Sequence, residues 1–217
     1  MVRSTSTAAE FHAKVVPDPA DAEVWLHDIT GAALVLGSTQ DADVVDVEAC
    51  RRAGVEVVRR RSGGGAVLLT PGQVTWVDVI VPAGSSGWAD DIHAPMVWVG
   101  RQLAAVFDEL RGDALGDEAV TVHEGPMITT EWSRVVCFDG VGAGEVLLGG
   151  RKLVGISQRR TRHAARLQCC WYSRYDASAL VDLLVPAHRP AVAELAPIAT
   201  VRQEIAAAIP AALAARL

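Results

Sequence analysis

The chain has 217 residues, of which 50% are hydrophobic and 21% are charged, and its formal net charge is −6. That length suits one domain with a substantial core, and the acidic balance gives no basic footprint for nucleic acid, which we exclude as an expected partner. No apolar stretch is long enough to span a membrane and the N-terminus has no signal-peptide core, so we expect a cytoplasmic protein without a membrane partner.

Residues 1–22 are polar and interrupted by prolines, which predicts a loosely attached lead-in to a single domain over 23–217. The apolar run at 32–37 predicts a buried strand. Residues 41–54 carry acidic residues early, arginines late and a final glycine, which predicts a helix. Further strands are expected at 55–58, 66–69 and 74–81, so that the glycine-rich loop between the first two would lie in the middle of a sheet.

The second half of the chain predicts a helix over 91–111, followed by short strands. These strands are expected at 119–125, 144–150, 151–158 and 166–173. The alanine- and leucine-rich tail from 178 to 217 is broken by prolines and predicts short packed helices. Strands grouped around a few helices, without strict alternation, predict an α+β fold.

The cysteine spacing points away from a metal or disulfide scaffold. The four cysteines form no C-x-x-C pair and have no histidine at zinc-finger spacing, so we expect no metal site. The basic residues are unusual, because only Lys14 and Lys152 among 20 are lysines. A lysine in such a chain indicates a place that needs a compact ammonium group.

The stretch VRRRSGGGAV at 58–67 places three glycines after three arginines. Glycine is costly to order, and a β-bulge or wide turn explains one glycine better than three in a row. The alternative is a ligand that lies against bare backbone. The stretch matches neither a P-loop nor a dinucleotide fingerprint, which leaves an anion or acyl site built on a sheet. Strand alternation would let only one or two of Arg59, Arg60 and Arg61 serve it.

A second basic and glycine-containing segment is GGRKLVGISQRRTR at 149–162. Lys152 stands there at the start of an apolar strand, where a lone lysine is usually exposed. Together, the two segments indicate an electropositive pocket for a phosphorylated or acyl-phosphate species.

These segments resemble the lipoate-protein ligase A family, within the larger group of biotin and lipoate ligases and octanoyltransferases. ALVLGSTQ (33–40), VRRRSGGGAVLL (58–69) and RKLVGIS (151–157) follow its pattern in order, and the likeness covers about residues 30–175. The resemblance implies the catalytic-domain fold of that group, an α+β domain whose mixed, mainly antiparallel central sheet is flanked by helices.

The resemblance also implies site residues. The expected adenylate contacts are Arg60, Gly65, Ala66, Val67, Leu68 and Lys152. The expected acyl-chain and other substrate contacts are Ser62, Gly63, Gly64, Gln73, Val154 and Gly155. Lys152 is the expected catalytic residue, because it would touch both the acyl carbonyl and the phosphate.

The implied reaction activates lipoate or octanoate with ATP and Mg²⁺ as an acyl-adenylate. The acyl group then passes to a lysine of a lipoyl carrier domain, as in 2-oxoacid dehydrogenase or glycine cleavage complexes. The chain departs from the ligases in carrying Gln73 where they have asparagine. We also expect no separate C-terminal accessory domain, in which case full adenylation would require a separate accessory subunit.

Two alternatives remain open. In related octanoyltransferases and amidotransferases a cysteine in the region of Cys137 forms an acyl-thioester without ATP or any cofactor, whereas most free cysteines are simply small buried residues. The other alternative is a non-catalytic module that binds the acyl group or its adenylate. A biotin ligase fits less well, because its glycine motif differs.

Overall fold

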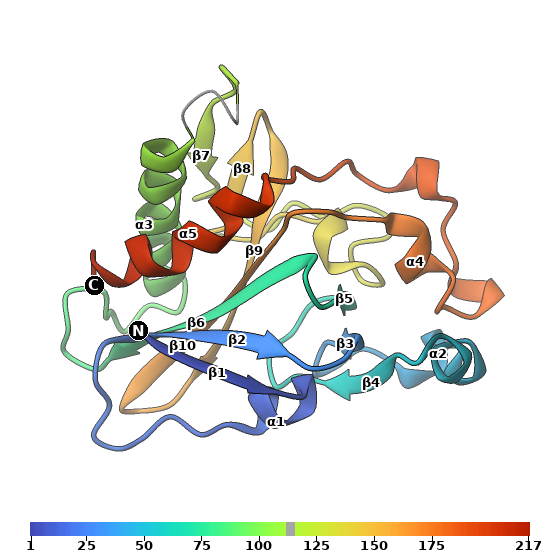
Figure 1. Cartoon of the computed structure of the whole chain (residues 1–217), viewed down its shortest axis with the longest axis horizontal. Coiled ribbons are helices and arrows are strands. Elements are labelled where there is room, and N and C mark those ends of the chain that lie inside the picture. The colour runs from blue at the N-terminus through green and yellow to red at the C-terminus, as the bar shows by residue number, and fades with distance from the viewer. Residues whose placement is uncertain (112–115) are drawn as a thin grey trace.

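The computed structural model describes residues 1–111 and 116–217, which form a large and a small β-sheet. The large sheet has the order β1-β2-β6-β10-β9-β8-β7, and its neighbouring strands are antiparallel except for β1 and β2. Its strands are β1 (Val2–Ser6), β2 (Glu23–Ile29), β6 (Val74–Pro82), β7 (Val120–Val122), β8 (Val146–Leu148), β9 (Arg151–Arg160) and β10 (Ala164–Tyr172). The predicted α+β fold is therefore confirmed (Figure 1).

The small sheet has β3 (Ala33–Leu36) at its centre, with β4 (Glu56–Arg59) parallel and β5 (Val67–Leu69) antiparallel to it. The glycine-rich loop therefore joins the two outer strands of a small sheet and does not lie in the middle of the main one. The prediction was wrong on this point because local sequence does not reveal that β3 inserts between β4 and β5.

The helices are of very different lengths. They are α1 (Ala8–Ala13), α2 (Val47–Ala53), α3 (Ala94–Leu110), α4 (Ala177–Val181) and α5 (Gln203–Ala214), with 3-10 turns at Ala42–Val44, Cys137–Asp139, Pro186–His188 and Val192–Glu194. In the described ranges no helix combines the length and hydropathy needed to cross a bilayer.

The helix predicted over 41–54 is shorter in the structure. Residues 42–44 form a 3-10 turn, and Val45 and Asp46 are extended before α2 begins. The Asp46 carboxylate accepts a 2.8 Å hydrogen bond from Ala49 N and so caps α2. Gly54 ends the helix in the left-handed conformation, with φ of 65°.

The first residues of the chain are part of the fold. β1 pairs with β2 along its whole length, and α1 buries Ala8 and Phe11. Arg166, in β10, donates to Phe11 O and Lys14 O, both at 2.6 Å. A loosely attached lead-in was expected over 1–22, but residues 2–6 pair with β2, and Phe11 and Lys14 are bonded to Arg166, more than a hundred residues away in the sequence.

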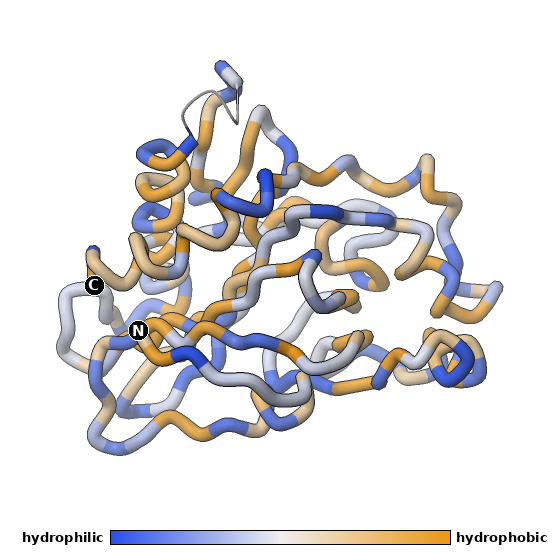
Figure 2. Tube along the Cα trace, in the orientation of Figure 1, coloured by the Kyte–Doolittle hydropathy of each residue, from blue (hydrophilic) through white to orange (hydrophobic). Residues whose placement is uncertain are grey.

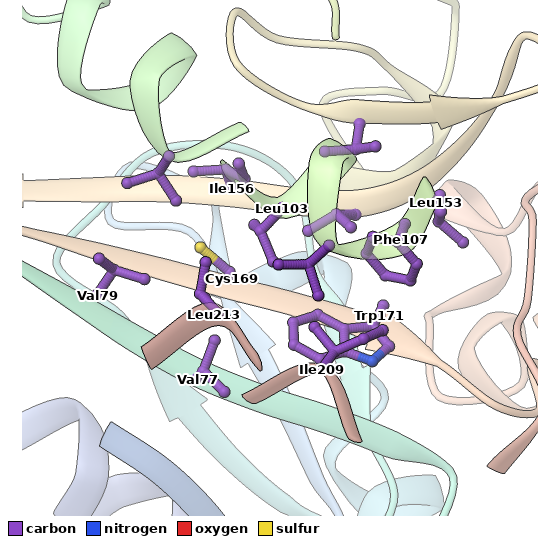
Figure 3. Packing of buried hydrophobic residues seen from close by; sticks show 14 of the residues in the cluster. Val77, Val79, Leu103, Phe107, Leu153, Ile156, Cys169, Trp171, Ile209 and Leu213 are labelled. Carbon is purple, nitrogen blue, oxygen red and sulfur yellow. The ribbon is translucent and has the colours of Figure 1, made fainter. Parts of the chain in front are cut away.

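The main core covers one face of the large sheet. Val77, Val79, Cys169 and Trp171 project from β6 and β10 toward Leu103 and Phe107 of α3 and Ile209 and Leu213 of α5 (Figure 3). Hydrophobic and hydrophilic residues alternate along α3, as expected of a helix with one buried face (Figure 2).

The opposite face of the large sheet carries the residues that strand alternation places between those of the core. Trp76 and Tyr172 on this face pack with Val35, Val67 and Leu69 of the small sheet in a second apolar cluster. The two sheets therefore enclose a space between them, which α1 borders through Phe11.

The same face contains a buried ionic cluster. The Asp78 carboxylate is fully buried and accepts from Arg166 Nε and pairs with His27 Nε2, both at 2.7 Å. Burial alone would raise the pKa of Asp78, but the bonds and charges of His27 and Arg166 outweigh burial and hold that pKa below its ordinary value.

We predict that Asp78→Asn lowers the free energy of unfolding at pH 7 by about 3–5 kcal/mol, because it leaves the buried Arg166 charge uncompensated. The depressed pKa means that the wild-type contribution is complete above the ordinary value of 3.8 and is lost as the pH falls through the lower folded-state value. Urea unfolding should therefore show the two proteins converging in acid. Glu124→Gln, which breaks the exposed Arg101–Glu124 pair, is the control and should have a much smaller effect.

Candidate functional site

A mostly apolar cavity lies between the two sheets. It holds about 450 Å³ of empty space, partly open to solvent, and its apolar walls include Val35, Val67, Leu69, Trp76 and Phe138. Arg60, Cys137, Ser157 and Gln168 add polar or reactive groups to the lining.

The glycine loop at one side of the cavity is packed backbone against backbone. A Cβ on Gly37 would lie 1.9 Å from Gly64 O, and one on Gly65 would lie 2.8 Å from Val136 N. Hydrogen bonds from Ala66 N to Val135 O (2.7 Å) and from Cys137 N to Ala66 O (2.9 Å) join the loop to the segment that carries Cys137. Close packing thus accounts for Gly65, whereas a Cβ on Gly63 would meet nothing within 4 Å.

Arg60 holds the glycine loop in shape. Its guanidinium is buried and donates to Val35 O at 3.1 Å, Gly63 O at 2.7 Å and Gly65 O at 2.9 Å. One of its nitrogens also lies 3.9 Å from Cys137 Sγ. Of the three arginines, Arg60 lines the cavity, while Arg59 donates to Gly37 O and Gln40 O on another side and Arg61 is exposed.

Lys152 lies behind the cavity wall and is only 3% exposed. Its ammonium is 2.7 Å from Glu145 Oε1 and donates to Cys137 O and Gly140 O, both at 3.1 Å. Burial alone would lower the pKa of Lys152, but the adjacent Glu145 carboxylate outweighs it and holds that pKa above its ordinary value. Lys152 is therefore a fixed cation beneath the turn that begins at Cys137.

Glu145 is a site residue that the sequence analysis missed. It is buried, and besides Lys152 it receives hydrogen bonds from Gly142 N (2.7 Å) and Ile156 N (3.1 Å). A glutamate just before an apolar strand gives no local sign of burial, so only the pairing of β8 with β9 reveals this role.

Cys137 is one of two half-buried cysteines in the cavity wall, and Cys170 is the other. Cys169 and Cys170 also line the cavity, but burial raises the pKa of Cys170 to about 12 and that of Cys169 well above its ordinary value, so both remain protonated at neutral pH. Cys50 is buried in a separate cluster. Cys137 is thus the cysteine best placed to react with a ligand in the cavity.

The other expected site residues divide according to the side of the strand on which they lie. Val67 and Gly155 line the cavity, and Ser62 Oγ donates to the lining residue Ser157 at 3.0 Å. Ala66 and Leu68 pack into the cluster beneath the small sheet instead, and Val154 belongs to the main core.

Gln73 lies outside the cavity lining, in the turn between β5 and β6. Its carbonyl oxygen accepts from Ser173 N at 2.8 Å. Among the described residues the structure therefore gathers Arg60, Cys137 and Lys152 but does not bring Gln73 to them.

The chain matches the family model described as the lipoyl protein ligase A/B catalytic domain over residues 10–215. No match was found among curated protein sequences. The first 9 and the last 2 residues of the 217 lie outside the matched range, so the family model covers the small sheet, the cavity lining and every strand of the large sheet except β1.

Three solved structures show a similar fold. A lipoate-protein ligase A bound with ATP has 17% identity and a TM-score of 0.62, with 86% of this chain and 68% of that chain covered. A putative lipoate protein ligase from T. acidophilum with bound lipoic acid has 15% identity and a TM-score of 0.63, covering 97% and 82%. A bi-partite lipoate protein ligase with its E2 lipoyl domain, from Thermoplasma acidophilum, has 15% identity and a TM-score of 0.57, covering 98% and 82%.

We predict that Gly37→Ala destabilises the glycine loop, because its new Cβ would overlap Gly64 O. Overpacking of this kind costs about 1–3 kcal/mol, which urea unfolding would detect. Gly31→Ala is the matched control, since a Cβ there meets nothing within 4 Å. Equal stability of the two variants would show that the loop does not pack against Gly37 in solution.

Proposed function

The chain belongs to the lipoyl protein ligase A/B catalytic-domain family, and on that basis we propose that it transfers an octanoyl or lipoyl group to the ε-amine of a lysine on a lipoyl carrier domain. We further propose that the acyl group passes through a thioester on Cys137. The observation that carries this proposal is the position of Cys137 Sγ, in the wall of an apolar cavity and 3.9 Å from the Arg60 guanidinium.

The proposed transfer has two steps, acylation of Cys137 and transfer of the acyl group to an acceptor lysine. The Cys137 thiolate attacks the carbonyl carbon of an octanoyl- or lipoyl-carrier, a C–S bond forms, and the C–N bond to the donor lysine breaks as its amine takes up a proton. The amine of a lysine on an acceptor carrier then attacks the thioester, a C–N bond forms, and the thiol is released with its proton. Neither step requires ATP.

Fixed charge and an apolar wall support these steps. Arg60 lies beside the thiol, and the Lys152 ammonium is bonded to the carbonyl of Cys137 itself, so two cations lie near the point where negative charge would develop. The apolar walls of the cavity would take the acyl chain. Lys152 also positions the turn that carries the nucleophile, through its bond to Cys137 O.

An ATP-dependent lipoate-protein ligase is the second candidate, favoured by the likeness of the fold to a ligase A structure bound with ATP. In that reaction Arg60, Gly65 and Lys152 would hold the acyl-adenylate. It ranks second because both cations already have partners within the protein. Arg60 donates to three backbone carbonyls, and Lys152 pairs with Glu145. No group of three acidic, histidine or cysteine side chains in the described ranges could hold a metal, so Mg²⁺ would be held chiefly by the phosphates.

The carrier is expected to be a lipoyl domain of the kind found in 2-oxoacid dehydrogenase or glycine cleavage complexes. One similar structure comes from an archaeal lipoylation system with a bi-partite ligase and its E2 lipoyl domain, which supports a carrier domain as the substrate to test. The same structure makes a separate accessory subunit a reasonable addition when the ligase reaction is assayed.

We predict that incubation with an octanoylated carrier, without ATP, adds one octanoyl group to Cys137 and then octanoylates an acceptor carrier. Intact-protein mass spectrometry would follow both steps. Cys137→Ser should abolish transfer, whereas Cys50→Ala, in a cluster away from the cavity, should retain it. Product that forms only with free acid and ATP, with pyrophosphate release and unaffected by Cys137→Ser, would instead establish the ligase.

We predict that Lys152→Met reduces the transfer rate about 100- to 1,000-fold, the usual effect of removing one stabilising group from a charged transition state. This variant also leaves Glu145 buried without its cation, which destabilises the fold. The double variant Lys152→Met/Glu145→Gln carries no unpaired charge, so it should be more stable than Lys152→Met in urea unfolding yet equally slow. Normal transfer by the double variant would remove Lys152 from the site.

A further inference from the structure

A half-buried histidine from the N-terminal helix lines the cavity. The ring of His12 packs against that of Trp76 at a centroid distance of 4.6 Å and a tilt of 33°, and both residues line the cavity. Its Nδ1 lies 3.2 Å from Gln168 Nε2, and its Nε2 is buried with no hydrogen-bond partner among the described residues. A buried polar atom without a partner is uncommon and costs free energy, so it requires an explanation.

The contact with Gln168 fixes the tautomer of His12. An amide nitrogen can only donate, so His12 Nδ1 is the acceptor and Nε2 carries the proton. Burial lowers the pKa of His12 to about 4, so the ring is neutral at neutral pH. His12 therefore brings to the cavity lining an uncharged N–H donor for which the described part of the chain offers no acceptor.

The backbone on both sides of His12 is held in place. Arg166 donates to Phe11 O before it and to Lys14 O after it, both at 2.6 Å, and Asp78 anchors Arg166 from within the sheet. A donor held by buried groups on a sheet is preorganised, and its position depends little on the ligand.

His12 and the turn that carries Cys137 lie at different ends of the cavity. On this face of β10 the side chains follow in the order Gln168, Cys170 and Tyr172. His12 contacts Gln168, whereas the Phe138 ring lies 5.2 Å from that of Tyr172. Gln168 and Tyr172 are four positions apart, which corresponds to about 13 Å of strand. A chain attached at Cys137 and extended along β10 would thus bring its far end toward His12.

We propose that His12 is a specificity-determining residue, which selects acyl groups that carry a hydrogen-bond acceptor near their distal end. A saturated octanoyl chain leaves the N–H of His12 without a partner, whereas the dithiolane sulfur of a lipoyl group, or an oxygen in the same place, accepts from it. The inference rests on the proposed function, because it assumes that the cavity holds the acyl chain, and it makes lipoyl the preferred substrate over octanoyl.

The test compares the dissociation constants of octanoate, lipoate and 8-hydroxyoctanoate by calorimetry in the whole protein. The wild type should bind the two acceptor-bearing acids more tightly than octanoate. His12→Phe keeps a ring but removes the donor, so the preference should fall roughly fivefold to tenfold, the usual worth of one hydrogen bond. His12→Gln offers an amide donor in its place and should restore part of the preference.

His163→Phe is the matched control, because His163 lies half-buried in the turn between β9 and β10, beside Asp18, and outside the cavity lining. This variant should leave unchanged the ratio between the dissociation constants of octanoate and the acceptor-bearing acids. Thermal unfolding should show that each variant is folded. An unchanged ratio in folded His12→Phe, or no binding of any of the three acids, would overturn the inference. A preserved preference for acceptor-bearing acids without acyl transfer would reject the proposed function alone.

Discussion

The buried carboxylate of Asp78 holds together parts of the chain that are far apart in sequence. It lies in β6, pairs with His27 of β2 and accepts from Arg166 of β10, so it fixes three neighbouring strands on the face opposite the main core. Arg166 extends this network to the carbonyls of α1. A carboxylate is costly to bury, and it is stable here because each partner is itself fixed in the sheet. The network therefore closes the cavity on the side of the N-terminal helix.

A second buried ion pair plays the corresponding part at the other end of the cavity. Glu145 and Lys152 lie on either side of the β8–β9 turn, and their remaining hydrogen bonds reach Gly142 N, Ile156 N and the carbonyls of Cys137 and Gly140. A change of charge at either residue would therefore alter the hydrogen bonds that hold the turn carrying Cys137. The thiol of Cys137 is thus positioned by an ionic interaction that itself has little contact with solvent.

The sequence allowed the fold class, most strands and the two basic glycine segments to be predicted, because those features depend on local patterns. Val67 and Leu68 show what local sequence patterns could not predict, which is the side of the strand that faces the cavity. Both stand in the recognised motif, yet one lines the cavity and the other packs beneath the small sheet, since neighbouring strand residues face opposite ways. Glu145 and His12 could not be found from the sequence, because their significance arises only from partners in β9 and β10. The separation of β4 from β5 by β3 was hidden for the same reason.

The hydrogen bonds of Arg60 distinguish the two proposed routes, a thioester on Cys137 and an ATP-dependent acyl-adenylate. A guanidinium that donates to the carbonyls of Val35, Gly63 and Gly65 stabilises a glycine loop whose backbone lies close against the segment of Cys137. Turning it toward a phosphate would leave those buried carbonyls without their donor, at a cost that the new charge-assisted bonds would have to exceed. A thioester on Cys137 requires no such exchange, because the thiol already lies beside the guanidinium in the cavity wall. The present bonds of Arg60 therefore favour the proposed acyl-thioester over a bound nucleotide.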